Sequence, residues 1–124
     1  MNVKQVIVIR KDLKMRRGKE IAQGSHASIM FLINRLKGGK TEVILSDVEQ
    51  EWIKTGYTKI CLQVNSEHEL EQMFQLAIDA GFEADLITDF GKTEFNNIPT
   101  KTALAIGPDI SEKIDKITSG LKLY

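Results

Sequence analysis

The 124-residue sequence has little cysteine, little proline and no excess of either charge: Cys61 is the only cysteine, and 17 basic residues balance 17 acidic ones. A single cysteine excludes an internal disulfide and a thiolate metal cluster, and it suits a reducing compartment. No run of about 18 apolar residues is present to span a membrane. Residues 3–10 have a strand-like pattern where an exported protein has an apolar signal region. We therefore expect a cytoplasmic protein.

The balanced charge offers no overall field to attract a polyanion, but the charges are distributed unevenly. Residues 10–19 (RKDLKMRRGK) contain a single anion, Asp12, whereas residues 65–85 are mainly acidic. Any nucleic-acid binding must therefore come from the basic segment. Its cations are Arg10, Lys11, Lys14, Arg16, Arg17 and Lys19.

The hydrophobic pattern predicts one α/β domain over residues 1–124, because a chain of this length that is 42% hydrophobic can build a single core. Residues 3–10 are apolar at nearly every central position, which is typical of a strand covered on both faces. The predicted strands are residues 3–10, 58–64, 84–88 and 101–106. The predicted helices cover residues 18–36, a short segment after 46, a segment after 66, and about ten residues after 111.

Two of these helices begin with a predicted capping box, Ser46 with Glu49 and Ser66 with Glu69. Strands that are separated by helices favour parallel neighbours, whereas the last two strands have only a loop between them and can pair antiparallel. We therefore expect a three-layer α/β/α fold with a mixed four-stranded sheet. Cys61 lies within a predicted strand, where we expect a buried, small hydrophobic residue.

The first candidate site is the basic loop with the start of the first helix. Lys19, Gln23 and His26 are spaced i, i+4, i+7 and line one stripe, which continues into apolar Met30 and Ile33. Such a stripe, leaning on the sheet, opens a pocket at the carboxyl edge of the first strand, where open α/β sheets usually bind ligands. The helix N-terminus suits phosphate. The alternative is that the cations only solvate a loop and that His26 is a core histidine.

The second candidate site follows the third predicted strand. Asp89 precedes a glycine turn, and Lys92, Thr93 and two threonines at the start of the last strand, Thr100 and Thr102, follow it. A carboxylate, an amine and hydroxyl groups at one sheet edge can orient water and polarise a carbonyl. The alternative is that Asp-x-Gly serves only as a turn.

Other site types find no support in the sequence. It has no GxGxxG or Walker pattern, which argues against the usual nucleotide cofactors. His26 and His68 lack the spacing of metal ligands, so we expect no metal site. No GxSxG motif is present for an α/β-hydrolase nucleophile.

Three groups of motifs, taken together, resemble the class-two peptidyl-tRNA hydrolases. The first comprises Arg10 to Met15, Gly18-Lys19, and Ala22-Gln23 to His26-Ala27; the second is Leu86 to Glu94; the third comprises Ala105 to Pro108, Ile114 to Thr118, and Leu121 to Tyr124. They occur in the family's order and cover most of the chain. The resemblance implies the family's mixed-sheet α/β/α domain and metal-independent hydrolysis of the ester between a peptide and the terminal ribose of tRNA. It also implies a homodimer with no cofactor.

The same resemblance suggests which residues act. The catalytic set that it implies is Lys19, Gln23, Asp89, Thr93 and Thr102, with His26 and Lys11 as secondary members. We expect Asp89 to orient or deprotonate the attacking water, Lys19 and a threonine hydroxyl to stabilise the oxyanion, and Gln23 to position the substrate carbonyl. The residues expected to bind tRNA phosphates are Arg10, Lys11, Lys14, Arg16, Arg17 and Lys92.

The sequence also departs from the family. Phe90 and Lys92 occupy positions where alanine and arginine are more common, and lysine lacks the planar fork of arginine. The loop before Thr102 is about one residue longer than usual, which leaves Thr100 as an alternative. Residues 38–50 match poorly. A tRNA-binding or scaffolding protein without turnover, and an unrelated small-molecule α/β enzyme, are therefore the competing hypotheses.

Overall fold

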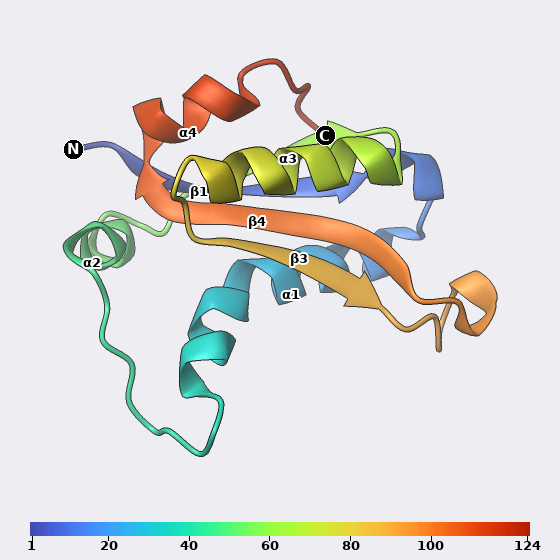
Figure 1. The fold of residues 1–124 in the computed structure, drawn as a ribbon, viewed down its shortest axis with the longest axis horizontal. Helices are drawn as coiled ribbons and strands as arrows, with labels where there is room; N and C mark the ends of the chain where they lie inside the picture. Colours follow the sequence, from blue (N-terminus) through green and yellow to red (C-terminus); the bar gives the residue numbers. More distant parts are fainter.

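The computed structural model describes residues 1–124, which form a mixed four-stranded sheet with helices on both faces (Figure 1). The strands are β1 (Val3–Arg10), β2 (Lys59–Val64), β3 (Ala84–Asp89) and β4 (Thr100–Ile110). The helices are α1 (Arg17–Leu36), α2 (Asp47–Lys54), α3 (Glu67–Asp79) and α4 (Ser111–Thr118), with 3-10 turns η1 (Lys11–Leu13) and η2 (Phe95–Asn97). The predicted α/β class and mixed sheet are confirmed. None of the helices has the length and apolar character needed to cross a membrane.

The strand order is β2-β1-β4-β3, so the first and last strands in the chain lie at the centre of the sheet. β1 pairs parallel with β2, and β4 runs antiparallel to both β1 and β3. The apolar run in β1 is explained by burial on both faces. Val6 and Val8 are buried on one side, and Ile7 and Ile9 are buried on the other.

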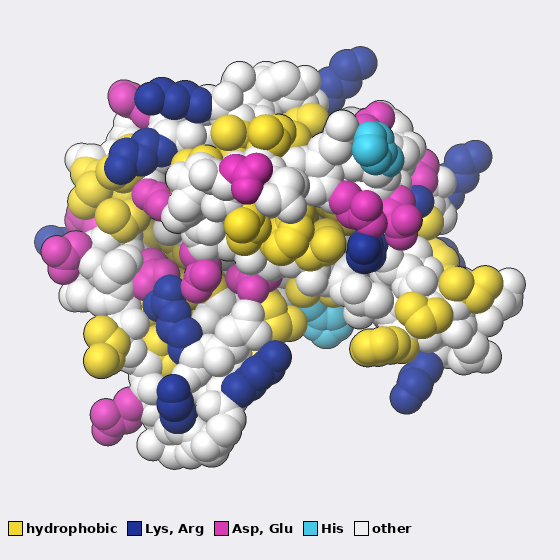
Figure 2. Space-filling view, in the orientation of Figure 1, with side chains coloured by type: hydrophobic (Ala, Val, Ile, Leu, Met, Phe, Trp, Pro, Cys, Tyr) yellow, Lys and Arg dark blue, Asp and Glu magenta, His cyan; other side chains and the backbone are white.

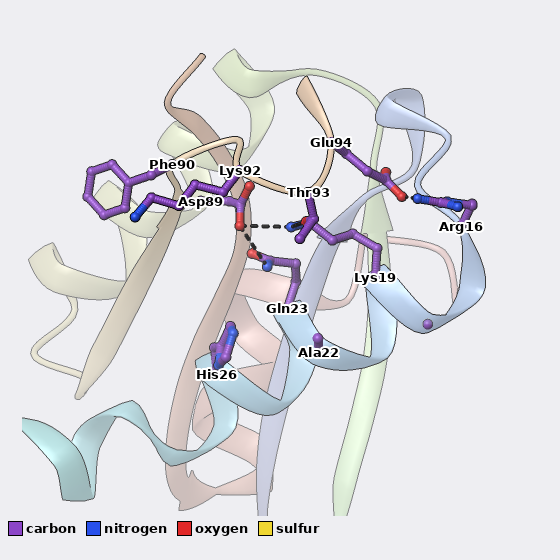
Figure 3. Close-up of a pocket in the computed structure, with 11 residues that line it drawn as sticks. Arg16, Lys19, Ala22, Gln23, His26, Asp89, Phe90, Lys92, Thr93 and Glu94 are labelled. Carbon is purple, nitrogen blue, oxygen red and sulfur yellow. Dashed lines mark hydrogen bonds and ion pairs between the residues drawn. The ribbon is translucent and has the colours of Figure 1, made fainter. Parts of the chain in front are cut away.

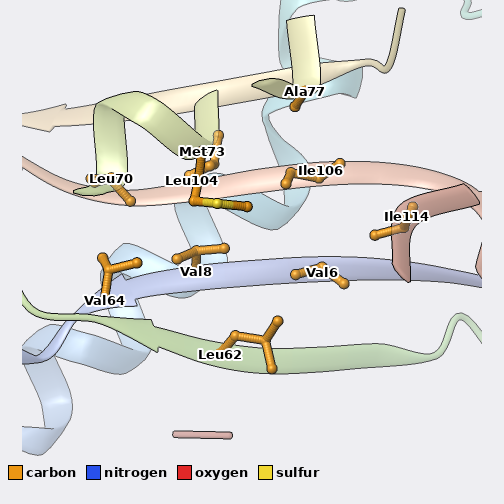
Figure 4. Close-up of a cluster of buried hydrophobic side chains, with 10 residues drawn as sticks. All are labelled: Val6, Val8, Leu62, Val64, Leu70, Met73, Ala77, Leu104, Ile106 and Ile114. Atoms are coloured by element: carbon orange, nitrogen blue, oxygen red, sulfur yellow. The ribbon is translucent and has the colours of Figure 1, made fainter. Parts of the chain in front are cut away.

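The larger core cluster lies between the sheet and the helices α3 and α4 (Figure 4). Leu70 from α3 and Ile114 from α4 are fully buried against Val8, Leu104 and Ile106 of the two central strands. These contacts stabilise the packing of β1 and β4 against α3 and α4, because each buried aliphatic side chain contributes roughly 1.5–3 kcal/mol relative to exposure.

Helix α1 covers the opposite face of the sheet, through a stripe that agrees only in part with the predicted one: Gln23 is buried, but His26 is exposed. Ala27 and Phe31 are buried, whereas Ile33, which the prediction placed on the inward stripe, is 39% exposed. Met30, on the same predicted stripe, is partly buried against the core. Small residues lie on this face: Ala27 is fully buried, and a Cβ atom at Gly24 would meet the side chains of Ile7 and Ile9 at 3.8 Å, an ordinary contact distance. The buried face therefore passes through Ala27 and Phe31, and Ile33 lies outside it.

The two predicted helix caps have different outcomes. At α2, Ser46 and Glu49 form the full reciprocal capping box, as predicted. At α3, the Ser66 hydroxyl accepts from the backbone N–H of Glu69, but the Glu69 carboxylate accepts from the N–H of Asn65, one residue before the cap. The second box was thus predicted correctly only in its first half.

Cys61 is exposed rather than buried, so this prediction was wrong. β2 is an edge strand, and α1 does not cover it fully on the face where Cys61 lies. The end of the chain partly protects this edge, because the Tyr124 N–H donates to the Cys61 carbonyl and Leu123 bridges to Leu62. Pairing of the terminal residues limits the exposed edge that a strand otherwise presents.

A network of ion pairs that was not predicted from the sequence connects the C-terminal end of α1 to its neighbours. Arg35 donates two hydrogen bonds to the buried carboxylate of Glu49, both at 2.7 Å, and a further one to Glu83 at 3.0 Å. Burial opposes ionisation of Glu49, but the hydrogen bonds and charge of Arg35, together with Ser46, lower its pKa. α1 is thereby anchored at its C-terminus, which leaves its N-terminus to carry functional groups.

Candidate functional site

Side chains from α1 and β3 converge at the end of the sheet where β1 and β3 finish and β4 begins (Figure 3). Lys19 lies in the first turn of α1, Gln23 lies one turn later, and Asp89 is the last residue of β3. The Lys19 Nζ lies 2.9 Å from Asp89 Oδ1, and the Gln23 Nε2 lies 3.3 Å from the same oxygen. The structure thus brings together an amine and a carboxylate that are 70 residues apart in the chain.

The second oxygen of Asp89 fixes the turn that follows. Its Oδ2 accepts from the backbone N–H of Gly91 at 2.9 Å, two residues later. Gly91 has a positive φ of 78°, and a Cβ atom there would lie 2.7 Å from the backbone nitrogen of Ile98. Only glycine fits such a position. One oxygen of the Asp89 carboxylate therefore fixes the turn, while the other contacts Lys19 and Gln23.

Two of the predicted threonines contact the Lys19–Gln23–Asp89 cluster, each in a different way. The Thr93 Oγ1 accepts from Lys19 Nζ at 2.6 Å on the open side of the cluster. Thr102 is fully buried, and its hydroxyl donates to Gln23 Oε1. The hydroxyl of Thr100 instead donates to the Ile98 carbonyl. Thr102, and not Thr100, is thus the threonine that supports Gln23.

The ionisation of Asp89 is controlled by these neighbours. Burial tends to raise the pKa of its carboxyl group, but the hydrogen bonds from Lys19, Gly91 and Gln23, with the charge of Lys19, lower this pKa below the ordinary 3.8. Asp89 is consequently an anion at neutral pH. A carboxylate with a lowered pKa is a weak proton acceptor, so it is better suited to orienting a donor than to removing its proton.

The cluster lies in an open cleft of about 720 Å³. At one end, Arg16 Nε pairs with the Glu94 carboxylate at 2.8 Å. His26 also lines the cleft, but it is exposed and has no hydrogen bond to the cluster, so it is not a core histidine. The residues that line the cleft are Arg16, Gly18, Lys19, Ala22, Gln23, His26, Asp89, Phe90, Lys92, Thr93 and Glu94.

The cations predicted to bind phosphate differ in their availability. Lys11, Lys14, Arg17 and Lys92 are exposed and make no ion pair. Arg10 is engaged internally, because its guanidinium donates to the Asp12 carboxylate and to the Lys101 carbonyl, and its side chain is only 11% exposed. Arg10 therefore links η1 to β4, and its guanidinium is not free to bind a substrate phosphate.

The site has the components needed to add water to a polarised carbonyl. The ammonium of Lys19 and the amide of Gln23 are donors that point at one anionic oxygen, and the Thr93 hydroxyl lies beside the ammonium. Donors that are fixed in advance can stabilise negative charge that develops on a reacting oxygen. No group of three or more His, Cys, Asp or Glu side chains is placed to hold a metal ion.

Three site features were not predicted as functional from the sequence. These are the Arg16–Glu94 ion pair, the N–H of Gly91 and the exposed ring of Phe90. The glycine could have been assigned from the Asp-x-Gly spacing, since an aspartate commonly accepts from the N–H two residues later. No local pattern indicates the ion pair, which joins residues 78 positions apart.

The sequence is similar to curated proteins over nearly the whole chain. Curated proteins named peptidyl-tRNA hydrolase are 41% identical in Methanocaldococcus jannaschii, over 98% of this chain and 99% of that one, and 42% identical in Methanothermobacter thermautotrophicus, over 98% and 99%. The corresponding protein from Aeropyrum pernix is 40% identical over 98% and 95% of the two chains.

A solved structure of a protein of unknown function from Agrobacterium tumefaciens shares the fold, with a TM-score of 0.62, 14% identity, and coverage of 100% of this chain and 98% of that one. The family model described as "Peptidyl-tRNA hydrolase PTH2" matches residues 3–124. The chain therefore belongs to the class-two peptidyl-tRNA hydrolase family.

Proposed function

We propose that this protein hydrolyses the ester bond between a peptide and the terminal ribose of tRNA, which recycles the tRNA for translation. The observation that carries the proposal is the cluster of Lys19, Gln23 and Asp89 in a cleft that is open to solvent, within a chain of this family. We place the activity in the cytoplasm, where peptidyl-tRNA is produced.

In the reaction, water adds to the ester carbonyl, the bond from the carbonyl carbon to the ribose oxygen breaks, and the ribose hydroxyl leaves with a proton that comes from the water. Asp89 orients the attacking water, because its carboxylate is anionic and faces the cleft. Lys19 and the hydroxyl of Thr93 stabilise the negative charge on the carbonyl oxygen, and Gln23 positions the substrate carbonyl.

Thr102 positions Gln23 for this reaction, since its buried hydroxyl donates to Gln23 Oε1 and fixes the direction of the amide. The ammonium of Lys19 supplies the positive charge that a metal ion provides in other hydrolases, so the proposed reaction needs no metal. A chelator such as EDTA should leave the rate unchanged.

The tRNA is held by its phosphates, through cations around the cleft. Lys11, Lys14, Arg17 and Lys92 are exposed and unpaired, and Arg16 is 81% exposed in its side chain although its Nε is paired. Contacts of this kind release counterions and do not read bases, so affinity falls with salt and is insensitive to sequence.

We further propose that the protein is a homodimer through a second groove, of about 560 Å³, between α1 and β2. Ile21 and Ile29 of α1 are 64% and 48% exposed along this groove, and exposed Cys61 and Tyr124 lie on its other side. Contiguous apolar surface of this kind on a small protein is typical of a protein–protein contact. The groove is separate from the Lys19–Asp89 cluster, so pairing through it leaves the cleft open.

The alternative of a tRNA-binding protein without turnover is not favoured, because Lys19, Gln23, Asp89 and Thr93 are all in contact and ready to act. The departures at Phe90 and Lys92 change the rim of the cleft but none of these contacts. An unrelated small-molecule enzyme is not favoured either, since the chain belongs to the peptidyl-tRNA hydrolase family over residues 3–124.

The test is hydrolysis of N-acetyl-aminoacyl-tRNA by purified protein. The wild type should release the acetyl-amino acid, and Asp89→Ala should lower turnover about a hundredfold or more, as expected for the loss of a positioned catalytic group. Asp85→Ala is the matched control, because Asp85 lies in the same strand but hydrogen-bonds to Asn34 outside the cleft. Absence of product from the wild type would reject the proposed function.

A further inference from the structure

Phe90 exposes an aromatic ring at the edge of the cleft, immediately after Asp89. Its exposed fraction is 67%, and the ring lines the same cleft as the Lys19–Asp89 cluster. Single exposed apolar residues are ordinary on protein surfaces. Phe90 differs from them because the turn that presents it is fixed by the Asp89–Gly91 hydrogen bond and by the packing of Gly91 against the Ile98 backbone. The backbone that carries the ring is thus bonded to Asp89 itself.

The two ends of the cleft differ in chemistry. Phe90, Lys92 and His26 lie on one side of Asp89, and the Arg16–Glu94 pair lies on the other (Figure 3). Lys92 is exposed and has no ion pair, whereas Arg16 at the opposite end is paired with Glu94. Hydrophobic side chains, with a Lys or Arg side chain at their lower edge, lie on the part of the surface that projects beyond β3, near η2 (Figure 2). The Phe90 end therefore offers an aromatic face with a free ammonium next to it.

An aromatic ring beside a free cation matches a nucleotide better than it matches a peptide. Bases stack on aromatic rings while cations contact the neighbouring phosphates, which is the general pattern of single-stranded nucleic-acid sites. A peptide chain is variable in its side chains and offers Lys92 no constant anion. In the substrate, the base is joined to the same ribose that carries the ester. A platform for that base has to lie next to the reacting groups, and Phe90 adjoins Asp89 in the chain.

We propose that Phe90 is the stacking platform for the terminal adenine of the tRNA, with Lys92 on the phosphate that precedes it. This inference rests on the proposed ester hydrolysis. Phe90 is a binding residue in this assignment, and it takes no part in the bond-breaking step.

The experiment compares two short RNA substrates that carry the same N-acetyl-aminoacyl ester on their terminal ribose. One ends in CCA, and the other has the same sequence but lacks the terminal adenine base. With the adenine substrate, Phe90→Ala and Phe90→Leu should raise KM roughly 5- to 150-fold, the equivalent of about 1–3 kcal/mol per stacked base, with little change in kcat. Phe90→Trp should preserve the wild-type KM, because it keeps a stacking face.

With the base-free substrate, the wild type and Phe90→Ala should have the same KM. Ile98→Ala is the matched control, since Ile98 is 62% exposed in the same loop, and this variant should keep the wild-type KM with each of the two substrates. Wild-type KM for Phe90→Ala or Phe90→Leu with the adenine substrate, or an equal loss with both substrates, would overturn the inference while leaving the hydrolase standing. A wild type that cleaves neither substrate would overturn both.

Discussion

Thr102 provides a sharp test of how the cluster is built. Its hydroxyl is fully buried and is the one protein donor to Gln23 Oε1, and that bond directs Gln23 Nε2 toward Asp89. Thr102→Val keeps the shape of the side chain but removes the donor. The buried carbonyl oxygen of Gln23, in a residue that is 2% exposed, is then left without a partner.

Leaving a buried acceptor unpaired costs about 1–3 kcal/mol, so the free energy of unfolding should fall by that amount and Tm by several degrees. If the amide rotates instead, Oε1 takes the place of Nε2 at 3.3 Å from the Asp89 oxygen, and the two oxygens repel each other. In the first case the Gln23–Asp89 contact is weakened, because no hydrogen bond holds the amide in its orientation, and in the second case the contact is lost. The same free energy, removed from the transition state, corresponds to a kcat about 5- to 150-fold lower.

The assay is steady-state hydrolysis of N-acetyl-aminoacyl-tRNA together with thermal unfolding of the same samples. Thr102→Ser keeps a hydroxyl and should restore most of the rate. Thr100→Val is the control, because the Thr100 hydroxyl donates only to the exposed Ile98 carbonyl. A Thr102→Val protein with the kcat and Tm of the wild type would refute the assignment of Thr102 as the residue that positions Gln23.

Three further predictions follow from the charges and the apolar groove. The pKa of Asp89 is lower in the folded protein than in the unfolded chain, so Asp89 stabilises the fold above the unfolded-state pKa and this stabilisation is lost as pH falls below 3.8. Carboxyl NMR should find the pKa of Asp89 below 3.8 in the wild type and higher in Lys19→Met. Lys92→Ala should reduce the salt dependence of tRNA binding by about one unit of slope, and an unchanged slope would exclude a phosphate contact. Ile21→Asp should shift the protein to monomer in analytical ultracentrifugation, whereas Ile44→Asp, at a 92% exposed position outside the groove, should not.

The sequence was sufficient to predict the elements whose formation is local. The β-branched run of residues 3–10 predicted a central strand, and Ser46 with Glu49 predicted the start of α2. The inward face of α1 was predicted only in part, because Gln23 and Met30 face the core but Ile33 is exposed. Which residues of a helix face the sheet depends on how the helix packs in the tertiary structure, and the periodicity of the sequence does not contain this information.

The site was predictable in part, for a topological reason. Lys19 follows the end of β1, and Asp89 ends β3; because these strand ends lie at the same edge of the sheet, the two side chains meet. Arg10 shows the limit of this reasoning. Its charge suggested a phosphate contact, but Asp12 and the Lys101 carbonyl bind it internally. Whether a cation is free depends on the positions of its neighbours in space, and composition does not reveal them.

The measurement that bears most directly on the role of the cluster is the rate of peptidyl-tRNA hydrolysis by Lys19→Ala, Asp89→Ala and the double variant. The two groups share one oxygen contact of 2.9 Å and should act as a unit, so each single variant should lose about a hundredfold or more and the double variant should lose little beyond either. Lys4→Ala, which breaks the exposed pair with Asp115, should keep the wild-type rate. Full activity in either single variant at the cleft, or losses that multiply in the double variant, would contradict a shared catalytic role for Lys19 and Asp89.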